Sequence, residues 1–310
     1  MAYPIDKKLV VAVSATALFD LSEEHAYYLA HGVDKFRALQ RARKNDIPAL
    51  GAAYPFIKGL LNFNKAHGDE QPVEVVILSR HHPDAGLRIM NAVEHYGLGI
   101  TRANFLGGQM PYPYMSAYNA VLYLSTNEVE VEKAIRAGHP AGLVLPCRNV
   151  VTEPGPQLRI AFDFDGVIVD DEAETVYTKS KNLDLFHDYE RRNRDKPLKQ
   201  GPLLPLMQRI SVLQKAERAK AEADPDYMPL IQVAIITARN APSHERLLNT
   251  LDSLGIEHDQ LLLTGGIEKK RFLDVFSPHI FFDDQLGHLL PAADTTPSVH
   301  IPFGIKNNGG

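Results

Sequence analysis

The chain has 310 residues, 45% of them hydrophobic, and a formal net charge of -5. This length suits about two average domains, and the acidic balance argues against a large basic surface for a nucleic acid polymer or an anionic membrane. Cys147 is the only cysteine, so an intrachain disulfide and a CxxC-type zinc site are excluded. No apolar run approaches the roughly 20 residues that span a bilayer, and the first residues lack the pattern of a secretory signal. We therefore expect a cytoplasmic protein that acts on small molecules.

The order of features near the N-terminus recurs about 150 residues later. An apolar run over 10–19 is followed by acidic residues and a long polar, helix-prone stretch, and the run over 160–169 is followed in the same way. The recurrence places Ser14 opposite Asp163 and Thr16 opposite Asp165. Further matches continue along the chain: Phe36 with Phe186, Arg41 with Arg191, Gly51 with Gly201, 75–79 with 233–237, Gly107–Gly108 with Gly265–Gly266, and 121–125 with 280–284.

A repeat of this length indicates a duplicated domain rather than a solenoid unit. Strand–helix alternation alone would be common to any two α/β domains, but it would not align the two Gly-Gly pairs. Within each half, the alternation favours a doubly wound parallel sheet with helices on both faces. We expect domains over 1–152 and 153–310 with a linker over 149–157, a mainly helical cap over roughly 171–205, and a frayed tail over 307–310.

Polar side chains interrupt the apolar runs of the second half where each predicted strand ends. Because ligands of open α/β sheets bind at the carboxyl ends of the strands, these side chains should converge. Carboxylates from the first and last of these strands would form the hard oxygen site that Mg²⁺ prefers, together with substrate phosphate oxygens. Such a site suits attack by a carboxylate on a phosphomonoester. The residues concerned are Asp163, Asp165, Thr237, Lys269, Asp283 and Asp284.

Each of these residues also has a simpler explanation. An isolated Asp-x-Asp is usually a turn or a helix cap, and Lys270 and Arg271 are alternatives to Lys269. In order along the chain, however, Asp163-Phe-Asp-Gly-Val, Thr237-Ala-Arg, Lys269 and Phe282-Asp-Asp resemble the four motifs of the haloacid dehalogenase superfamily. The resemblance implies two tandem haloacid dehalogenase-like, Rossmann-like domains. It also implies the following roles: Asp163 as nucleophile, Asp165 as general acid and base, Thr237, Ala238 and Lys269 as phosphoryl ligands, and Asp163, Asp165, Asp283 and Asp284 as the Mg²⁺ site.

Over about residues 10–304 the chain resembles the cytosolic 5'-nucleotidase type I family. The resemblance rests on Val11-Ala-Val-Ser with Ala17-Leu-Phe-Asp, Leu106-Gly-Gly, 196–203 and Pro278-His-Ile-Phe-Phe-Asp-Asp-Gln. It implies hydrolysis of nucleoside 5'-monophosphates to nucleoside and phosphate with Mg²⁺. Two alternatives stay open: a phosphatase or phosphotransferase for another small phosphomonoester, and a nucleotide-binding regulatory protein without turnover. Whether the chain forms a homo-oligomer is also open.

The predicted cap contains candidate substrate ligands. Aromatic residues there could stack on a base, and basic residues could meet phosphate or ribose. Aromatic residues at such spacing usually pack a helix, however, and basic runs usually face water. The candidates are Phe186, His187, Tyr189, Arg191, Arg192, Arg194, Lys196 and Lys199, with Tyr112, Tyr114 and Tyr118 of the first half as further base-stacking candidates.

The first half keeps the pattern of the second without its carboxylates. Ser14 and Thr16 stand in place of the Asp pair, Ser79 in place of Thr237, and Leu124–Ser125 in place of Asp283–Asp284. Without these charged ligands, the half cannot build the Mg²⁺ site. We expect a decayed duplicate whose hydroxyl groups could still hold a phosphate, and in which His81 and His82 are solvated.

Overall fold

The computed structural model describes residues 3–307, and within them ten strands form one sheet. Every neighbouring pair is parallel except β5 with β10. The mostly parallel α/β architecture is therefore as predicted. The strands are β1 (Leu9–Val13), β2 (Val73–Ser79), β3 (Arg102–Phe105), β4 (Leu122–Ser125), β5 (Ala141–Val144), β6 (Leu158–Phe162), β7 (Ile231–Thr237), β8 (Gln260–Leu263), β9 (Ile280–Asp283) and β10 (Ser298–His300).

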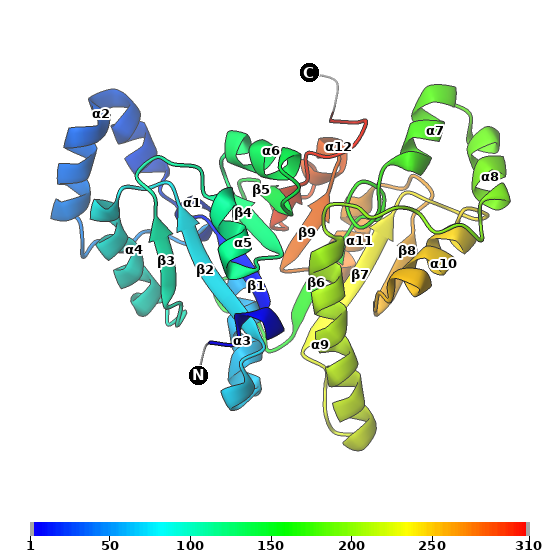
Figure 1. The fold of residues 1–310 in the computed structure, drawn as a ribbon, viewed down its shortest axis with the longest axis horizontal. Helices are drawn as coiled ribbons and strands as arrows, with labels where there is room; N and C mark the ends of the chain where they lie inside the picture. Colours follow the sequence, from blue (N-terminus) through cyan, green and yellow to red (C-terminus); the bar gives the residue numbers. More distant parts are fainter. Residues whose placement is uncertain (1–2, 308–310) are drawn as a thin grey trace.

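The sheet order is β3-β2-β1-β4-β5-β10-β9-β6-β7-β8. From the centre outward, the first half runs β5, β4, β1, β2, β3, and the second half runs β10, β9, β6, β7, β8. In each half the order is therefore fifth, fourth, first, second and third strand. The two halves lie side by side in Figure 1, and their fifth strands meet at the centre of the sheet. The antiparallel β5–β10 pair thus joins the halves edge to edge, whereas the sequence predicted a separate parallel sheet in each.

Helices cover both faces of the sheet. Two helical segments stand beyond the strands at opposite upper corners of Figure 1: α2 in the first half, and α7 with α8 in the second. The α-helices are α1 (Ala15–Leu18), α2 (Ser22–Ala42), α3 (Tyr54–Ala66), α4 (Pro83–His95), α5 (Met115–Tyr118), α6 (Glu128–Arg136), α7 (Glu172–Ser180), α8 (Leu183–Arg192), α9 (Leu204–Ala223), α10 (His244–Leu254), α11 (Lys269–Phe276) and α12 (Leu286–Leu289). Short 3-10 helices are η1 (Ile5–Lys7), η2 (Gly68–Glu70) and η3 (Tyr112–Tyr114).

The predicted cap is only partly helical. Its helices, α7 and α8, end at Arg192, and 193–203 is irregular. The following helix, α9, contacts β7 and β1 of the sheet. Among residues 3–307, no helix combines the length and apolar character needed to cross a membrane.

The hydrophobic core differs between the two faces of the sheet. On one face, a single cluster runs through both halves and includes Leu9 and Val11 of β1 with Ile160 and Phe162 of β6. On the other face, Val10 of β1 belongs to a cluster confined to the first half, apart from that of the second half. The alternation of side chains along β1 explains this division, because successive residues of a strand point to opposite faces.

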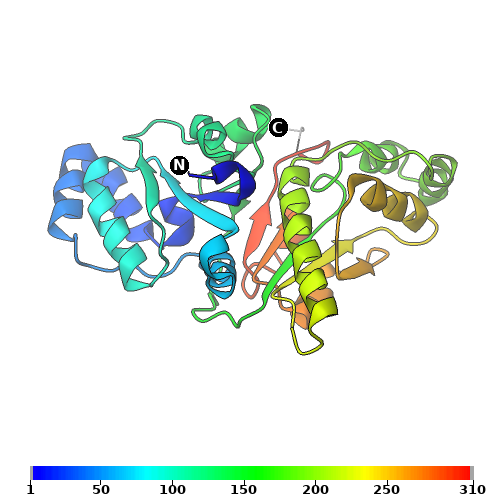
Figure 2. The ribbon, with the colours of Figure 1, turned by 60° about the horizontal axis from the view of Figure 1, so that its bottom comes forward.

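The shared core depends on two helices near the centre of the molecule, α3 and α9 (Figure 2). Each contacts the first strand of the opposite half, α3 with β6 and α9 with β1. The approach of α3 is close enough that a Cβ atom on Gly59 would lie 2.7 Å from a Leu158 methyl group. The ring of Phe56 on α3 also packs edge-on against Phe282 of β9, with ring centroids 6.2 Å apart. The first half therefore supplies part of the packing beneath the second.

Backbone hydrogen bonds fix the correspondence between the halves and correct one predicted match. Ser14 donates its N–H to the Leu124 carbonyl at 2.8 Å, and Asp163 donates to the Phe282 carbonyl at 2.8 Å. Leu124 thus corresponds to Phe282. The residues opposite Asp283 and Asp284 are therefore Ser125 and Thr126, one position later than the sequence comparison placed them. Two apolar runs can be aligned equally well when one is shifted by one residue, whereas the hydrogen bonds between the strands allow only one alignment.

The expected fraying of the tail is wrong for Asn307. Its side-chain amide donates to the carbonyls of Asp284 and Phe303 at 3.0 and 2.7 Å, and its Oδ1 lies 3.0 Å from His300 Nε2. Residues 308–310 lie outside the described part of the chain.

Candidate active site

The strand ends of the second half bring a lysine and two carboxylates into contact. Asp163 follows β6, Asp283 ends β9, and Lys269 begins α11. Lys269 Nζ lies 2.8 Å from Asp163 Oδ2 and 2.7 Å from Asp283 Oδ2. All three side chains are nearly inaccessible to solvent. Burial alone would lower the pKa of Lys269, but the two carboxylates outweigh burial and raise it, so the lysine stays charged.

The neighbours of Lys269 lie outside this cluster. Lys270 Nζ pairs with Asp274 at 2.7 Å on the surface of α11, and Arg271 is exposed. Of the three basic residues that the sequence left as alternatives, Lys269 is the one that contacts Asp163 and Asp283.

The positive charge next to the carboxylates of this cluster is not sufficient to keep all of them ionised. Burial, opposed by Lys269 and reinforced by Asp283, raises the pKa of Asp163 to about 7. Burial and then Asp163 and Asp283 raise the pKa of Asp284 to about 9. The pKa of Asp283 instead falls, because Lys269 and His288 together outweigh its burial. Within the described chain, Asp284 Oδ1 is buried without a hydrogen-bond partner. An additional cation would satisfy this oxygen and permit all three carboxylates to ionise.

Gly166 makes room for the Asp284 carboxylate. A Cβ atom on Gly166 would lie 2.7 Å from the Asp284 carboxyl carbon, and the glycine has a φ of +72°. The Asp-Gly-Val part of the first motif thus has a geometric reason, since both the space and the backbone conformation require glycine.

His288 is a neighbour of the carboxylates that the sequence analysis did not identify. Its Nδ1 lies 3.2 Å from Asp283 Oδ2. Potential ligand atoms of Asp163, Asp283 and His288 lie within 4.8 Å of one another. A site for Mg²⁺ would favour the oxygen atoms of Asp163, Asp283 and Asp284 over the imidazole nitrogen. His288 follows Asp283 by five residues, but nothing in the sequence distinguishes it from other surface histidines.

Asp165 is held by a bidentate ion pair with Arg239. Arg239 Nε and Nη2 donate to the two Asp165 oxygens at 2.8 and 2.7 Å. The same guanidinium also pairs with Glu190 of α8, whose other oxygen accepts a hydrogen bond from Arg246 at 2.9 Å. Arg246 in turn pairs with Glu172 of α7 at 2.9 Å. These ion pairs connect Asp165 to both cap helices.

The sequence analysis gave Arg239 and Glu190 no role. Arg239 belongs to the second motif, Thr237-Ala-Arg, and this position was the sequence feature that could have indicated a role for it. Glu190 lies in a charged run that reads as a solvated helix face, yet it is only 1% exposed. Its burial depends on two arginines that follow it by about 50 residues, which helix periodicity does not reveal.

Thr237 and Ala238 lie at the carboxyl end of β7, directly beside β6 in the sheet. Thr237 is buried, and its Oγ1 accepts a hydrogen bond from the Arg239 N–H at 3.2 Å. Thr264 N–H donates to the Thr237 carbonyl at 2.9 Å, which fixes the turn of the second Gly-Gly pair beside it.

The aromatic candidates of the cap are engaged in packing. Phe186 is buried, with its ring centroid 5.8 Å from the Arg239 guanidinium carbon. Tyr189 donates its hydroxyl hydrogen to Glu172 at 2.6 Å. His187 Nε2 lies 2.9 Å from Asn240 Oδ1, in the loop that follows Arg239. These residues fasten α8 over the strand ends, and Phe186 comes nearest to the site through Arg239.

The basic candidates of the cap are exposed. Lys196 and Lys199 contribute backbone carbonyls to the structure, which accept hydrogen bonds from Arg246 Nε and from the Asp170 N–H at 2.9 and 3.0 Å. The exposed cap arginines line a surface depression at the end of α8: Arg191, Arg192 and Arg194.

The tyrosines of the first half do not belong to the site in the second. Tyr112 and Tyr118 pack against the core cluster confined to the first half, and the Tyr118 hydroxyl donates to Asn104 at 2.8 Å. Tyr114 is 38% exposed.

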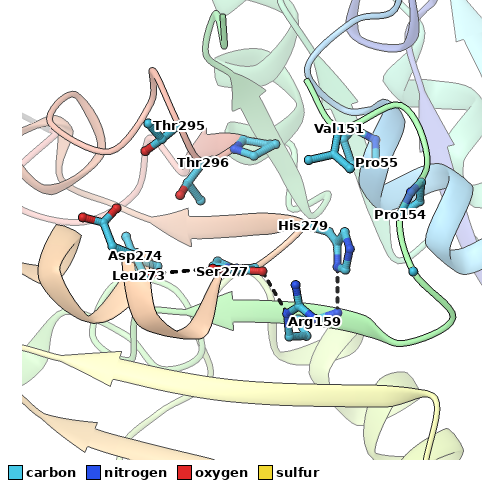
Figure 3. A pocket seen from close by; sticks show the side chains of 13 residues that line it. Pro55, Val151, Pro154, Arg159, Leu273, Asp274, Ser277, His279, Thr295 and Thr296 are labelled. Atoms are coloured by element: carbon cyan, nitrogen blue, oxygen red, sulfur yellow. Dashed lines mark hydrogen bonds between the residues drawn. The ribbon is translucent and has the colours of Figure 1, made fainter. Parts of the chain in front are cut away.

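A separate pocket of about 380 Å³ lies at the amino ends of β6 and β9 (Figure 3). Arg159, one of the lining residues, donates its N–H to His279 Nδ1 at 3.0 Å and its Nε–H to the Ser277 carbonyl at 2.9 Å. Because the carboxylates follow the opposite ends of the same strands, this pocket is distinct from the candidate active site.

The chain is similar to known proteins over nearly its whole length. A family model described as 5'-nucleotidase matches residues 1–308. The human cytosolic 5'-nucleotidase 1B (Homo sapiens) is 34% identical over 287 residues, covering 91% of this chain but only 46% of the human protein. The chain thus spans less than half the length of this relative.

Solved structures give no further information about the fold. A histidinol dehydrogenase from Elizabethkingia anophelis covers 91% of this chain and 66% of its own, with a TM-score of 0.24 and 11% identity. A Pnkp1/Rnl/Hen1 complex covers 96% and 97%, with a TM-score of 0.32 and 11% identity. Both TM-scores are too low to indicate a common fold. The match over residues 1–308, together with the human relative, shows that the chain belongs to the 5'-nucleotidase family.

Proposed function

We propose that the chain is a 5'-nucleotidase, which hydrolyses nucleoside 5'-monophosphates to nucleoside and phosphate at the strand ends of its second half. Family membership supports nucleotide hydrolysis. The observation that carries the location is the buried contact of Lys269 with Asp163 and Asp283, beside an Asp165 held by Arg239. Nucleophile, phosphate ligand and acid–base group thereby lie at one edge of the sheet.

In the proposed reaction, an Asp163 carboxylate oxygen attacks the phosphorus atom of the substrate. The bond from phosphorus to the 5' oxygen breaks. One Asp165 oxygen must first leave its pair with Arg239 and take up a proton, which it then gives to the leaving alkoxide. The product on the enzyme is an aspartyl-phosphate. Water then attacks that phosphorus and gives a proton back to Asp165, which releases inorganic phosphate and regenerates the Asp163 carboxylate.

The remaining residues of the site would hold the phosphoryl group and the acid–base group in place. Lys269 would contribute a fixed positive charge to the phosphoryl oxygens, and Thr237 a hydroxyl donor, with the Ala238 backbone beside it. Arg239 would fix the direction of the Asp165 carboxyl group. In the structure, the Lys269 ammonium group contacts the Asp163 carboxylate that we propose as the nucleophile. Substrate binding must therefore draw this ammonium group toward the phosphate.

A divalent cation fits the donor set. Asp163, Asp283 and Asp284 offer hard oxygen ligands, Asp284 Oδ1 has no partner among residues 3–307, and Gly166 leaves space beside it. The Asp165 backbone carbonyl is the fourth protein ligand that we propose. Mg²⁺, when bound, would offset the repulsion between the carboxylates and the phosphate and stabilise charge on the transferring phosphoryl group.

We also propose that the chain arose by duplication of a haloacid dehalogenase-like domain, with units over 1–152 and 153–310 and a cap within 171–205. The equivalent strand orders and the matched hydrogen bonds around Ser14 and Asp163 support this proposal. A cytoplasmic location is proposed from the name of the human relative, which is called cytosolic.

A substrate panel tests the activity. With Mg²⁺ present, phosphate release from nucleoside 5'-monophosphates should exceed that from sugar phosphates of similar size when kcat/KM is compared. Equal or faster release from the sugar phosphates would replace the nucleotidase proposal by a different phosphomonoesterase. Absence of turnover on every substrate, with a folded protein and measurable nucleotide binding, would favour the regulatory alternative.

A further inference from the structure

The strand ends of the first half keep the backbone framework of the candidate active site. Leu106 donates its N–H to the Ser79 carbonyl at 2.9 Å, as Thr264 does to Thr237 at 2.9 Å. His81 N–H donates to Ser79 Oγ at 3.3 Å, as the Arg239 N–H does to Thr237 Oγ1 at 3.2 Å. The two Gly-Gly pairs also share positive φ angles. The turns that would surround a phosphate are therefore present twice.

Hydroxyl groups occupy the positions of all four carboxylates. Ser14 and Thr16 replace Asp163 and Asp165, and the corrected register shows that Ser125 and Thr126 replace Asp283 and Asp284. The hydroxyls converge as the carboxylates do: Thr16 Oγ1 lies 3.1 Å from Ser14 Oγ and 2.7 Å from Thr126 Oγ1. The edge thus presents hydrogen-bond donors where the second half presents negative charge.

The balance of charge at this edge differs from that of the second half. Pro111 stands where Lys269 would be expected, but Arg80, which follows Ser79, brings its Nε within 3.7 Å of Glu130 Oε1. Glu130 is buried, and its other carboxylate oxygen accepts hydrogen bonds from Ser125 and Tyr123 at 2.7 and 2.6 Å. One cation therefore accompanies one hydrogen-bonded carboxylate here.

In the second half, by contrast, Lys269 contacts the carboxylates of Asp163 and Asp283 with Asp284 beside them, and Arg239 already pairs with Asp165 and Glu190. A phosphate dianion near those carboxylates would be repelled unless a metal ion were bound. The first half has no such excess of negative charge, so the same framework can accept an anion without a metal.

His81 takes the position of Arg239 and is only partly exposed, whereas the sequence predicted a solvated side chain. Its Nδ1 lies 2.8 Å from Ser79 Oγ, and its ring stacks on Phe36 of α2 with centroids 6.3 Å apart. Burial lowers the pKa of His81 to about 4, so the ring is neutral near pH 7. A neutral imidazole carries no charge that a carboxylate would have to balance. The Ser79 hydroxyl beside it remains available as a polar contact for a ligand.

We propose that the strand ends of the first half form a metal-independent binding site for a phosphate group, held by Ser14, Thr16, Ser79 and Arg80. The ligand is inorganic phosphate or the terminal phosphate of a small phosphate ester. The site is separate from the proposed nucleotidase site and does not depend on its activity. Among the described residues, no carboxylate hydrogen-bonds to the Ser14 or Thr16 hydroxyl, so these groups lack an activating base and the phosphate is bound and not transferred.

Titration calorimetry of the full chain with inorganic phosphate in EDTA tests this site. We expect saturable binding of one phosphate per chain. Arg80→Ala should weaken it by about tenfold, since a charge-assisted hydrogen bond is lost, and Arg80→Lys should keep most of the affinity. Ser14→Asp should abolish binding by restoring a negative charge. Thermal unfolding of each variant verifies that the fold is retained.

Thr237→Ala is the matched control, because it alters the equivalent position of the second half. Phosphate affinity in EDTA should be unchanged in this variant. Absence of saturable binding by the unaltered chain, or binding that Thr237→Ala removes and Arg80→Ala does not, would overturn the proposal. Nucleotide turnover with Mg²⁺ is measured separately, so the failure of either proposal can be recognised without the other.

A second titration distinguishes the two sources of phosphate. Asp163→Asn prevents the proposed hydrolysis, so this variant is titrated in EDTA with inorganic phosphate and with AMP. Equal affinities would identify the phosphate group alone as the ligand. Tighter binding of AMP that is still weakened by Arg80→Ala would identify a phosphate ester.

Discussion

The two strand-end edges of the molecule share a backbone framework and differ in chemistry. In the second half, Asp163 and Asp283 contact Lys269, whereas in the first half Ser14 and Ser125 occupy the same positions. The contrast shows that residues following a strand can change without loss of the strand itself. Strand positions are fixed by the core, while the residues just beyond them are free to acquire or lose a function.

The shared core explains why the first half would persist without catalytic carboxylates. Its helix α3 packs beside β6, and its edge strand β5 pairs with β10 next to the strand that carries Asp283. Loss of the first half would expose both the apolar cluster beneath β6 and an unpaired strand edge.

The largest expected effect is on turnover at Asp163. Asp163→Asn removes the proposed nucleophile and should lower kcat by more than about a thousandfold. Ser14→Ala, at the equivalent position, should leave kcat within about twofold. Steady-state phosphate release measures both variants. Comparable losses would contradict the assignment of the chemistry to the second half.

Arg239→Ala should have the next largest effect on turnover. Without the bidentate pair, Asp165 is no longer oriented, and kcat should fall by about a hundredfold, within the range of acid–base contributions. Arg239→Lys keeps the charge but not the planar geometry, so it should recover only part of the rate. A loss confined to KM would instead show that Arg239 acts in substrate binding.

One buried arginine in each half, Arg88 and Arg246, allows the contributions of the two halves to stability to be compared. Arg88 pairs with Glu24, and Arg246 pairs with Glu172 and Glu190. Arg88→Ala leaves the buried Glu24 without its close partner and should reduce the free energy of unfolding by about 3–5 kcal/mol. Arg246→Ala should cost less, because Glu190 keeps its pair with Arg239 and Glu172 is partly exposed. Only Arg246→Ala should also lower kcat, because its partner Glu190 contacts Arg239. Denaturant unfolding and turnover assays separate the two effects, and an equal kcat loss in Arg88→Ala would show that the halves are coupled in catalysis.

The pH dependence of stability should reveal the uncompensated carboxylates. Without metal, the folded-state pKa values of about 7 for Asp163 and about 9 for Asp284 lie above the ordinary value of 3.8, so the native state binds more protons than the unfolded chain. Stability should therefore fall as pH rises from about 7 to 9 in EDTA, whereas below about pH 6.5 the lowered pKa values of His81 and His279 act in the opposite direction. The lowered pKa of Asp283 acts only below about pH 4 and does not oppose this trend.

Mg²⁺ at about a hundred times its Kd should add about 2.7 kcal/mol, with the largest gain at high pH where its ligands ionise. Thermal unfolding with and without Mg²⁺ measures this difference. A melting temperature in EDTA that rises between pH 7 and pH 9 would contradict the account of the carboxylate cluster.

The smallest expected effect concerns Gly166. Gly166→Ala combines a positive φ with a contact at 2.7 Å to Asp284, and should cost about 1–2 kcal/mol of stability and weaken Mg²⁺ binding. Gly155→Ala is the control, because a Cβ atom there meets nothing within 4 Å. Similar metal affinity in both variants would exclude Asp284 as a ligand.

The sequence predicted the α/β class and the strand ends because both are local patterns. Apolar runs that stop at Asp163, Thr237 and Asp283 mark the strands and their carboxyl ends directly. The antiparallel β5–β10 pair could not be foreseen, since its strands are short and their pairing depends on packing between the halves. The one-residue error at Ser125 has a related cause, because an apolar strand does not fix its own register.

The ion pairs beneath the cap show a further limit of sequence reasoning. Arg239, Glu190 and Arg246 appear as ordinary charged residues in sequence, and only the fold of α8 onto the strand ends buries them together. The presence of helices in this segment, α7 and α8, was predictable from its length and charge.

Trapping of the phosphorylated residue tests the central claim most directly. The full chain is mixed with Mg²⁺ and a nucleoside monophosphate labelled in its phosphate, quenched in acid, digested and mapped by mass spectrometry. We predict an alkali-labile label on Asp163 and none on Ser14. A label on Ser14 that survives hydroxylamine, or turnover by a chain that never acquires a label on Asp163, would contradict the account.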